Sequence, residues 1–312
     1  MKVLLLDNWG EKAKEVLGEV AEVVYIYKHQ EFNQEIKKQV RRNYPIDGIV
    51  TGLEWNNWDN NFIIENSLTP PKFIASCTTG LDHIDTEYCR DKGIKIISLQ
   101  GETEFLQDVW ATAEHTWALI MSLVRKIPFA HADVCAGNWE RERWQGTELR
   151  GKTLGIVGYG RVGWQVARFA EVFGMRIANY DKYQSYGVRF EWLLQNSDII
   201  TAHVPLNNET RGMFGEKEFA TMKPGAYFIN TSRAPIVEPQ ALYNALDGKI
   251  AGVAIDVMEG YPNKYWEYLT EHAKEHNNLI ITPHIAGNTA ESREKTQLFI
   301  ANKIKDFIQG GG

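Results

Sequence analysis

The chain has 312 residues, of which 44% are hydrophobic and 24% are charged, enough apolar material for two cores of ordinary domain size. Its net charge of −6, without a basic stripe, argues against nucleic acid and anionic membrane surfaces as partners. The first apolar run, before Asp7, is too short for a signal peptide or a membrane span. The three cysteines, Cys77, Cys89 and Cys135, lack metal-like spacing, so we expect free thiols, a cytoplasmic location and no metal site.

Apolar runs alternate with helical patterns through the first hundred residues. The expected strands lie at 3–6, 23–27, 49–50, 73–75 and 94–97, and the expected helices lie near 11–20, 31–40 and 86–92. This alternation predicts a parallel sheet covered by helices on both faces. A long apolar helix is expected next, over 114–125, and Pro128 marks either an interruption or the start of a new helix.

Residues 151–181 carry the most specific local motif. An apolar run suited to a buried strand leads into Gly158-Tyr-Gly160-Arg-Val-Gly163, and apolar residues at helical spacing follow. Gly158 allows a tight turn, Gly160 allows a pyrophosphate to approach the backbone, and Gly163 allows the helix to pack closely on the strand. The helix N-terminus would hold the diphosphate. A second strand ends in Asp181, whose carboxylate suits the ribose hydroxyls and would repel a 2′-phosphate, so the segment predicts NAD rather than NADP.

The second half of the chain continues the same alternation. Further strands are expected at 198–204, 226–230, 251–257 and 279–282, with a helix around 191–195. A last helix near 290–308 is expected to leave the second half and return to the first. Two strand-rich halves imply a cleft between them in which a substrate meets the cofactor.

Three reactive side chains follow strands of the second half directly: Arg233, Asp256 and His284. Ligands of parallel α/β sheets bind beyond the carboxyl ends of the strands. Arg233 can grip a carboxylate through two hydrogen bonds and polarise the adjacent carbonyl. His284, which titrates near neutrality, can protonate the carbonyl oxygen as a hydride arrives. Behind a dinucleotide motif, this set predicts hydride transfer between NAD(H) and a 2-oxo acid.

Several longer motifs occur together in the chain, between about Phe73 and Thr289. They are Thr79-Gly80-Leu-Asp82-His-Ile-Asp85, Thr112-Ala-Glu114-His115, Leu154-Gly-Ile-Val-Gly158-Tyr-Gly160-Arg-Val-Gly163, His203-Val-Pro205-Leu, Met222-Lys-Pro-Gly225, Asn230-Thr-Ser-Arg233, Asp256-Val and Thr282-Pro-His284-Ile-Ala. In these motifs and in their order the chain resembles the D-isomer-specific 2-hydroxyacid dehydrogenases.

The resemblance implies an α/β fold of two doubly wound parallel-sheet domains. A Rossmann NAD-binding domain, 102–287, would be inserted into a flavodoxin-like substrate domain made of 1–101 and 288–312. The resemblance also implies a homodimer formed through the NAD-binding domains, with Trp139 as the aromatic residue that some members lend to the neighbouring subunit.

The resemblance assigns roles to single residues. Arg233 and His284 would be the catalytic pair acting on a D-2-hydroxy acid or its 2-oxo acid, and Asp256 would hold the nicotinamide carboxamide. The remaining cofactor-binding residues would be Gly158, Tyr159, Gly160, Arg161, Val162, Asp181, His203, Pro205, Thr210, Thr231 and Gly287. The substrate would be held by residues of the other domain, namely Gly52, Leu53, Thr79 and Gly80.

One departure from the family pattern bears on the catalytic histidine. Members usually carry a glutamate five residues after the Asp256 position, whereas this chain has Tyr261, and its nearest acid is Glu259. A neutral phenol can orient an imidazole but does not stabilise an imidazolium as a carboxylate does. We expect Tyr261 or Glu259 to orient His284, and we expect an activity optimum at lower pH than is usual in the family.

Two other functions stay open at this point. One is a non-catalytic NAD-sensing or protein-binding module on the same scaffold, although retention of Arg233 and His284 argues against it. The other is a formate-type dehydrogenase, in which a non-acidic partner of the histidine is tolerated. The segment 101–111 is longer than usual, and the nearby Trp55, Trp58 and Trp110 suit either a larger substrate or ordinary packing.

Overall fold

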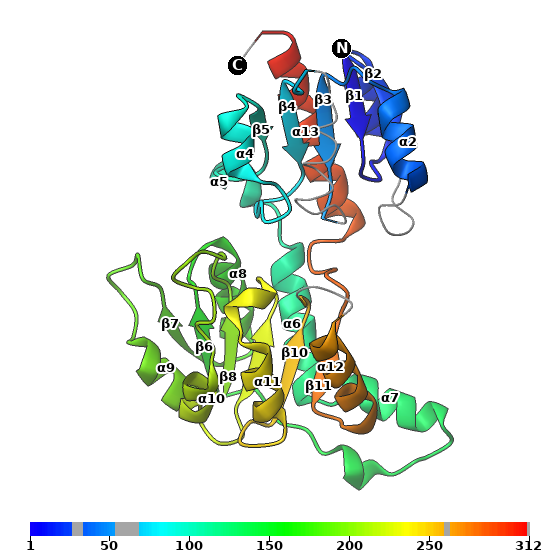
Figure 1. Ribbon diagram of the computed structural model, residues 1–312. Coiled ribbons are helices and arrows are strands. Elements are labelled where there is room, and N and C mark those ends of the chain that lie inside the picture. The colour runs from blue at the N-terminus through cyan, green and yellow to red at the C-terminus, as the bar shows by residue number, and fades with distance from the viewer. Residues whose placement is uncertain (27–33, 54–68, 259–262, 311–312) are drawn as a thin grey trace. The chain divides into compact units, whose positions relative to one another are not determined.

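The computed structural model describes residues 1–26, 34–53, 69–258 and 263–310. The chain divides into two compact units, one made of Met1–Asp108 and Thr289–Gly312 and the other of Val109–Asn288 (Figure 1). The domain boundaries expected from the sequence were 101–102 and 287–288, and the segment 102–108 makes its contacts in the first unit. Within the described residues, none of the helices has both the length and the apolar character that a membrane crossing requires.

The first unit is built on a parallel sheet with the strand order β2-β1-β3-β4-β5, which is the flavodoxin-like order. Its strands are β1 (Lys2–Leu5), β2 (Glu22–Tyr25), β3 (Gly48–Thr51), β4 (Phe73–Ser76) and β5 (Lys95–Ile97). Its helices are α1 (Glu11–Gly18), α2 (Gln34–Arg42), α4 (Thr86–Asp91), α5 (Thr103–Leu106) and α13 (Ala290–Ile308). Helix α13, near the C-terminal end of the chain, packs against α1 in this unit.

The central strands of this sheet are buried on both faces, which explains their apolar sequences. Every residue of β3 and β4 is buried, as expected for parallel strands covered by helices. At Gly48 on β3 an added Cβ would lie 2.1 Å from the Phe73 ring of β4, so only glycine fits. Phe73 also meets Phe307 of α13, with ring centroids 5.6 Å apart. This contact holds the last helix on the sheet.

The second unit carries a parallel sheet with the order β11-β10-β9-β8-β6-β7. Its strands are β6 (Thr153–Val157), β7 (Arg176–Tyr180), β8 (Ile199–Ala202), β9 (Tyr227–Asn230), β10 (Gly252–Ile255) and β11 (Leu279–Ile281). Its helices are α6 (Ala111–Val124), α7 (Ile127–Cys135), α8 (Arg161–Val172), α9 (Phe190–Asn196), α10 (Glu216–Thr221), α11 (Pro239–Leu246) and α12 (Lys264–Glu275). The chain moves outward from β6 to β7 on one side and from β6 to β8 on the other, so a topological switch point lies between β6 and β8.

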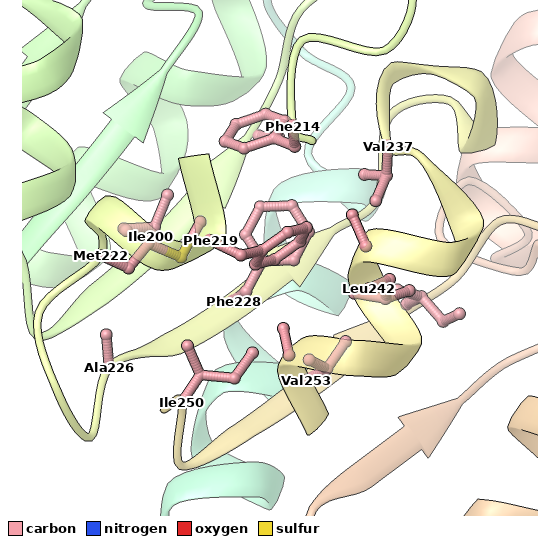
Figure 2. Close-up of a cluster of buried hydrophobic side chains, with 14 of the residues drawn as sticks. Ile200, Phe214, Phe219, Met222, Ala226, Phe228, Val237, Leu242, Ile250 and Val253 are labelled. Carbon is pink, nitrogen blue, oxygen red and sulfur yellow. The ribbon is translucent and has the colours of Figure 1, made fainter. Parts of the chain in front are cut away.

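Buried side chains cover both faces of this second sheet. On one face Phe228 of β9 lies between Phe214 and Phe219, with ring centroids 4.9 and 5.3 Å apart (Figure 2). On the other face α8 packs against β6 and α6 packs against β9 and β10, and Ile120 of α6 and Val166 of α8 are completely buried there. Each apolar side chain of this kind contributes about 1.5–3 kcal/mol relative to exposure. The two layers of helices hold the strand ends, and therefore the loops beyond them, in place.

The expected fold class is confirmed, because both sheets are parallel and doubly wound. Pro128 lies in the first turn of α7, so it starts a helix and does not interrupt one. The helices α10, α11 and α12 were not foreseen. The first two are short, and α12 buries only Leu269 and His272 in a sequence of mostly polar and aromatic residues, so its apolar periodicity is weak.

Candidate active site

The glycine-rich turn after β6 needs its glycines for different steric reasons. Gly158 has φ +92°, and an added Cβ there would lie 2.7 Å from the main-chain carbonyl of His203. At Gly163 an added Cβ would lie 2.2 Å from the Gly158 carbonyl oxygen, so α8 approaches the turn too closely for a side chain. At Gly160, in contrast, no atom lies within 4 Å of an added Cβ. The space in front of Gly160 therefore suits the close approach of a pyrophosphate.

Helix α8 begins beside this open space. Its N-cap is Gly160, and its first turn contains no acidic residue. The first N–H groups of a helix lack intrahelical partners, and the helix dipole favours an anion there. The guanidinium of Arg161 is engaged elsewhere, since Nη1 donates to the Val109 carbonyl at 2.6 Å, and burial lowers its pKa. Arg161 and Val162 can thus meet a diphosphate through their main-chain N–H groups.

Asp181 lies directly after β7, next to the same turn. Its Oδ2 accepts a hydrogen bond from the Tyr159 N–H at 2.9 Å, and its Oδ1 accepts one from the Tyr183 N–H at 2.9 Å. The carboxylate keeps further acceptor capacity for ribose hydroxyls. The neighbouring Lys182 is paired with Glu209, with Nζ 2.5 Å from the carboxylate oxygen. Because Lys182 is paired with Glu209, its positive charge is already compensated and would do little to attract the 2′-phosphate of NADP.

The loop after β8 faces the glycine-rich turn across the switch point. His203 is half-buried, and burial lowers its pKa to about 3, so it is neutral at physiological pH. Its Nε2 lies 2.9 Å from the Thr201 hydroxyl. Two residues further on, the Pro205 carbonyl accepts a hydrogen bond from the Thr210 hydroxyl at 2.7 Å. This bond closes the loop into a defined turn beside the proposed dinucleotide position.

The loops that follow β9, β10 and β11 emerge side by side. Asn230, the last residue of β9, is paired with Ile255 of β10, and Ile255 is paired with Ile281 of β11. Because the strands are parallel, their carboxyl ends meet at one edge of the sheet. Arg233 and His284 therefore leave the same edge on either side of Asp256.

The Arg233 loop is held by Asn230, which is only 1% exposed. Its Nδ2 donates to the Arg233 carbonyl at 2.9 Å. Its Oδ1 accepts from both the N–H and the hydroxyl of Ser232, at 3.0 and 2.8 Å. Arg233 is half-buried, and its Nη1 donates to the Ser232 carbonyl at 2.8 Å. The amide of Asn230 thus determines where the guanidinium leaves the sheet.

The His284 loop is shaped by Asp256, which is completely buried. The Oδ1 atom accepts from the Thr282 hydroxyl at 2.6 Å and from the Ile285 N–H at 2.9 Å. The Oδ2 atom accepts from the Ala286 N–H at 2.8 Å. The main-chain carbonyl of Asp256 accepts from the His284 N–H at 2.8 Å. One residue thereby holds the main chain on both sides of the histidine.

His284 adopts a left-handed backbone conformation, with φ +55°. This conformation costs a non-glycine residue about 1–2 kcal/mol, so the surroundings must offset it. The hydrogen bonds of Asp256 supply that offset, because bonds to a charged acceptor contribute about 1.5–3 kcal/mol each. Strained backbone held in this way is characteristic of functional sites.

The charge of Asp256 is secured by its partners. Burial raises the pKa of this carboxyl, but hydrogen bonds from His115, Thr282 and the loop amides outweigh the burial, so the pKa lies below its ordinary value. The Nε2 atom of His115 lies 3.4 Å from Oδ1 of Asp256 and 3.1 Å from the Thr282 hydroxyl. Asp256 is therefore an anion that organises the edge of the sheet.

Two further residues expected in the cofactor site differ in character. Thr231 is 7% exposed, and its hydroxyl lies 2.8 Å from that of Thr116. Thr116 already donates to the Thr112 carbonyl at 2.7 Å, so Thr231 must be the donor, and its side chain braces the loop against α6. Gly287 is exposed, and an added Cβ there would meet no atom within 4 Å.

The residues expected to hold the substrate lie in the first unit, at the carboxyl ends of adjacent strands. Gly52 and Leu53 follow β3, and Thr79 and Gly80 lie in the loop after β4, whose last residue is paired with the last residue of β3. An added Cβ at Gly52 would lie 3.1 Å from the Cγ of Asp7, and Leu53 is 46% exposed. The Gly80 carbonyl accepts from the Thr78 hydroxyl at 2.7 Å, which fixes the loop.

Some expectations lie outside the described residues, namely those on Glu259, Tyr261, Trp55 and Trp58. The segment 101–111, which is longer than usual in the family, contacts α13. Its Phe105 ring stacks on the Phe299 ring with centroids 3.9 Å apart, and Asp108 forms an ion pair with Lys295. This part of the segment thus packs within the first unit.

Sequence reasoning did not foresee the positioning roles of Asn230, His115 and Thr282. Each belongs to one of the motifs shared with the family, but only the tertiary contacts reveal which groups its polar atoms bind.

These features define a class of protein: a dinucleotide-binding α/β protein with an arginine, an aspartate and a histidine at one edge of its nucleotide-binding sheet. A family model described as "D-isomer specific 2-hydroxyacid dehydrogenase, NAD binding domain" matches residues 117–286. The chain is also 39% identical over 282 residues to the glyoxylate reductase of Thermococcus litoralis, with 85% of this chain and 81% of that protein covered. The chain belongs to the D-isomer-specific 2-hydroxyacid dehydrogenase family, and its second unit contains the family's NAD-binding domain.

Two more similarities extend over nearly the whole chain. The D-3-phosphoglycerate dehydrogenase of Methanocaldococcus jannaschii is 34% identical over 321 residues, covering 99% of this chain, although the chain spans only 58% of that relative's length. Among solved structures, a D-lactate dehydrogenase from Aquifex aeolicus complexed with NAD and lactic acid aligns with a TM-score of 0.82 and 28% identity. That alignment covers 99% of this chain and 96% of the other.

Proposed function

We propose that this protein is an NAD-dependent dehydrogenase that interconverts a D-2-hydroxy acid and its 2-oxo acid. The observation that carries the proposal is the common sheet edge from which Arg233, Asp256 and His284 emerge, in the same unit as the open turn at Gly160. The names of the relatives, which are dehydrogenases and reductases of such acids, favour this function over a non-catalytic NAD sensor.

Arg233 and His284 divide the work on the substrate. The guanidinium binds the substrate carboxylate and polarises the neighbouring carbonyl. The imidazole of His284 donates a proton to the carbonyl oxygen during reduction and takes it back during oxidation. NADH, when bound, supplies the hydride to the carbonyl carbon. The residues that would hold this cofactor are the N–H groups at the start of α8 for the diphosphate and Asp181 for the ribose.

Asp256 acts on the reaction through His284. Its carboxylate is turned toward the loop amides and keeps the histidine in its left-handed conformation. The family resemblance implies that Asp256 also holds the nicotinamide carboxamide. For that role its carboxylate oxygens would have to accept a hydrogen bond in addition to those from the loop. We therefore assign Asp256 primarily to positioning.

The first unit is proposed as the substrate domain. The loops carrying Gly52 and Thr79 lie next to each other at the carboxyl edge of its sheet, which is where ligands of such sheets bind. Their main-chain N–H groups would bind the substrate carboxylate.

The deciding experiment follows NADH absorbance with purified protein and a panel of 2-oxo acids that includes glyoxylate, hydroxypyruvate, 3-phosphohydroxypyruvate and pyruvate. Turnover of at least one acid, with a D-configured product, is the expected result. A second arm supplies formate with NAD. No turnover of any acid together with tight NADH binding would instead indicate the sensor, and turnover of formate alone would indicate a formate-type dehydrogenase.

We further propose that Tyr261 or Glu259 orients His284, with the consequence that the activity optimum lies at lower pH than in relatives with a glutamate after the aspartate. The test is the pH dependence of kcat/KM in the reductive direction. An apparent histidine pKa well above about 6.5, the value of free imidazole, would contradict this proposal.

We also propose a homodimer formed through the NAD-binding domains. Helix α7 has no buried residue and projects away from the sheet of its unit (Figure 1). Its Ile127 and Val134 are 53% and 46% exposed, and Trp139 beyond it is 86% exposed. Apolar side chains so exposed suit burial against a second copy of the chain. Sedimentation of the wild type should give a dimer, and replacing Val134 with Asp should shift it toward the monomer. A monomeric wild type would contradict the proposal.

A cytoplasmic location is the remaining proposal. It is supported by the free state of Cys77, Cys89 and Cys135 and by the absence of membrane-spanning helices from the described residues.

A further inference from the structure

Three potential metal ligands converge in the second unit, away from the loops described above. They are Asp247, directly after α11, His272 in α12 and His276, directly after α12. One donor atom from each residue lies within 4.8 Å of the donor atoms of the other two. Helices that follow parallel strands run back along the sheet, so the C-terminal ends of α11 and α12 lie toward its amino edge. The cluster is therefore remote from Arg233 and His284, which leave the carboxyl edge.

The tautomer of His272 is determined by its neighbours. The Nδ2 atom of Asn278 donates to the Leu246 carbonyl at 3.0 Å, which orients the amide so that its Oδ1 faces the histidine. That oxygen lies 2.8 Å from the Nε2 of His272, so Nε2 must carry the proton. The Nδ1 atom of the neutral ring is then an acceptor, and His272 is only 5% exposed.

This acceptor is turned toward a second acceptor. The Nδ1 of His272 lies 3.7 Å from the Oδ1 of Asp247, which is too long for a hydrogen bond. Two ligand atoms on one tetrahedral zinc ion are about 3.3–3.5 Å apart, given bond lengths near 2.0–2.2 Å. The observed separation would therefore need to shrink by only a few tenths of an ångström to bind an ion.

His276 completes the set. It follows His272 by four residues, which places both rings on one side of the helix end, and the two rings stack with centroids 4.2 Å apart. The neutral imidazole is the form that binds a metal ion. The proximity of His272 and His276 could not be predicted from the sequence because α12 itself was not predicted.

We propose that Asp247, His272 and His276 form a zinc-binding site that clamps the ends of α11 and α12 to the start of β11. Two imidazoles and one carboxylate are donors that Zn²⁺ accepts readily, and a water molecule would complete a tetrahedral set. His272 is oriented by Asn278, an outer-shell contact typical of metal-bound histidines. The proposal is independent of the dehydrogenase function.

Isothermal titration of the full chain with zinc chloride tests the site. The titration uses a Cys135→Ser background, because Cys135 and His131 lie 3.6 Å apart on α7 and could bind zinc themselves. One zinc per chain is expected. His276→Ala, an exposed position, should weaken binding at least about tenfold, as should Asp247→Asn. The matched control His131→Ala, an exposed histidine on α7, should leave the affinity unchanged.

Two further readouts decide the structure of the site. Thermal unfolding should shift to higher temperature with zinc in the control and not in His276→Ala, since a ligand that binds only the folded state stabilises it. X-ray absorption of the zinc-loaded protein should show two imidazole ligands. Absence of zinc binding, or binding that His276→Ala and Asp247→Asn leave intact, would overturn the proposal.

Discussion

Replacing Gly160 with alanine separates cofactor binding from folding. An added Cβ at Gly160 meets no atom within 4 Å, and Gly160 has φ −78°, which alanine adopts without strain. Loss of a glycine N-cap destabilises the folded chain by less than about 1 kcal/mol. Alanine also lowers the entropy of the unfolded chain, which stabilises the folded chain by about 0.4–1 kcal/mol. The free energy of unfolding should therefore change by less than about 0.5 kcal/mol.

The same methyl group occupies the space that the pyrophosphate needs. Overpacking by one methyl group typically costs about 1–3 kcal/mol, which corresponds to roughly 5- to 150-fold weaker binding. Gly163→Ala differs, because its Cβ would lie 2.2 Å from the Gly158 carbonyl oxygen and must displace α8. That variant should lose both stability and NADH affinity, whereas Gly18→Ala, in open space at the end of α1, should change neither the affinity nor the fold.

The assay combines fluorescence titration with NADH and chemical unfolding of the three variants. The expected result is that Gly160→Ala unfolds like the wild type but binds NADH at least about fivefold more weakly. If Gly160→Ala binds NADH with wild-type affinity, the diphosphate does not lie against this turn, and the cofactor site proposed here is wrong.

Three other predictions follow from the site. Asp256→Asn turns an N–H₂ group toward one of the loop donors, so chemical unfolding should reveal a loss of about 3 kcal/mol, and a loss below about 1 kcal/mol would contradict the role of the carboxylate. Asp181→Asn removes the negative charge that repels a 2′-phosphate, so the ratio of kcat/KM for NADH over NADPH should fall at least about tenfold; an unchanged ratio would place the discrimination elsewhere. Burial raises the pKa of Asp198, which precedes β8, but hydrogen bonds from Lys223 and from the Thr153 N–H outweigh the burial, so this pKa, like that of Asp256, lies below the ordinary 3.8. Both groups therefore stabilise the folded chain above that pH, and this stability should disappear as the pH falls through their folded-state pKa values. Thermal unfolding followed from about pH 5 to about pH 2, the range over which such depressed carboxyl groups titrate, should show a steeper loss in the wild type than in Asp198→Asn.

The dinucleotide motif was predictable because its determinants are local. The turn, the helix start and Asp181 lie within 31 consecutive residues, 151–181, and each glycine answers a steric demand of its immediate neighbours. Strand positions were predictable for the same reason, since parallel strands buried on both faces have continuous apolar sequences. The placement of Arg233 and His284 followed from the rule that ligands bind beyond the carboxyl ends of parallel strands.

The contacts that position these side chains were not predictable in the same way. Asp256 and Thr116 act through contacts with distant parts of the sequence, namely those of Asp256 with His115 and of Thr116 with Thr231. A sequence motif identifies such residues but does not indicate the atoms with which their side chains form hydrogen bonds. Helix α12 was not predicted because it buries few side chains. Without this helix, the proximity of His272 to Asp247 could not be predicted either.

The most direct test of the dehydrogenase account measures kcat and KM for the best 2-oxo acid in Arg233→Ala and His284→Ala. Arg233→Ala should raise KM and lower kcat, because the guanidinium contacts the substrate carboxylate in both the ground state and the transition state. His284→Ala should lower kcat by about 10²–10⁴-fold with little change in KM. Wild-type turnover in either variant would contradict the account.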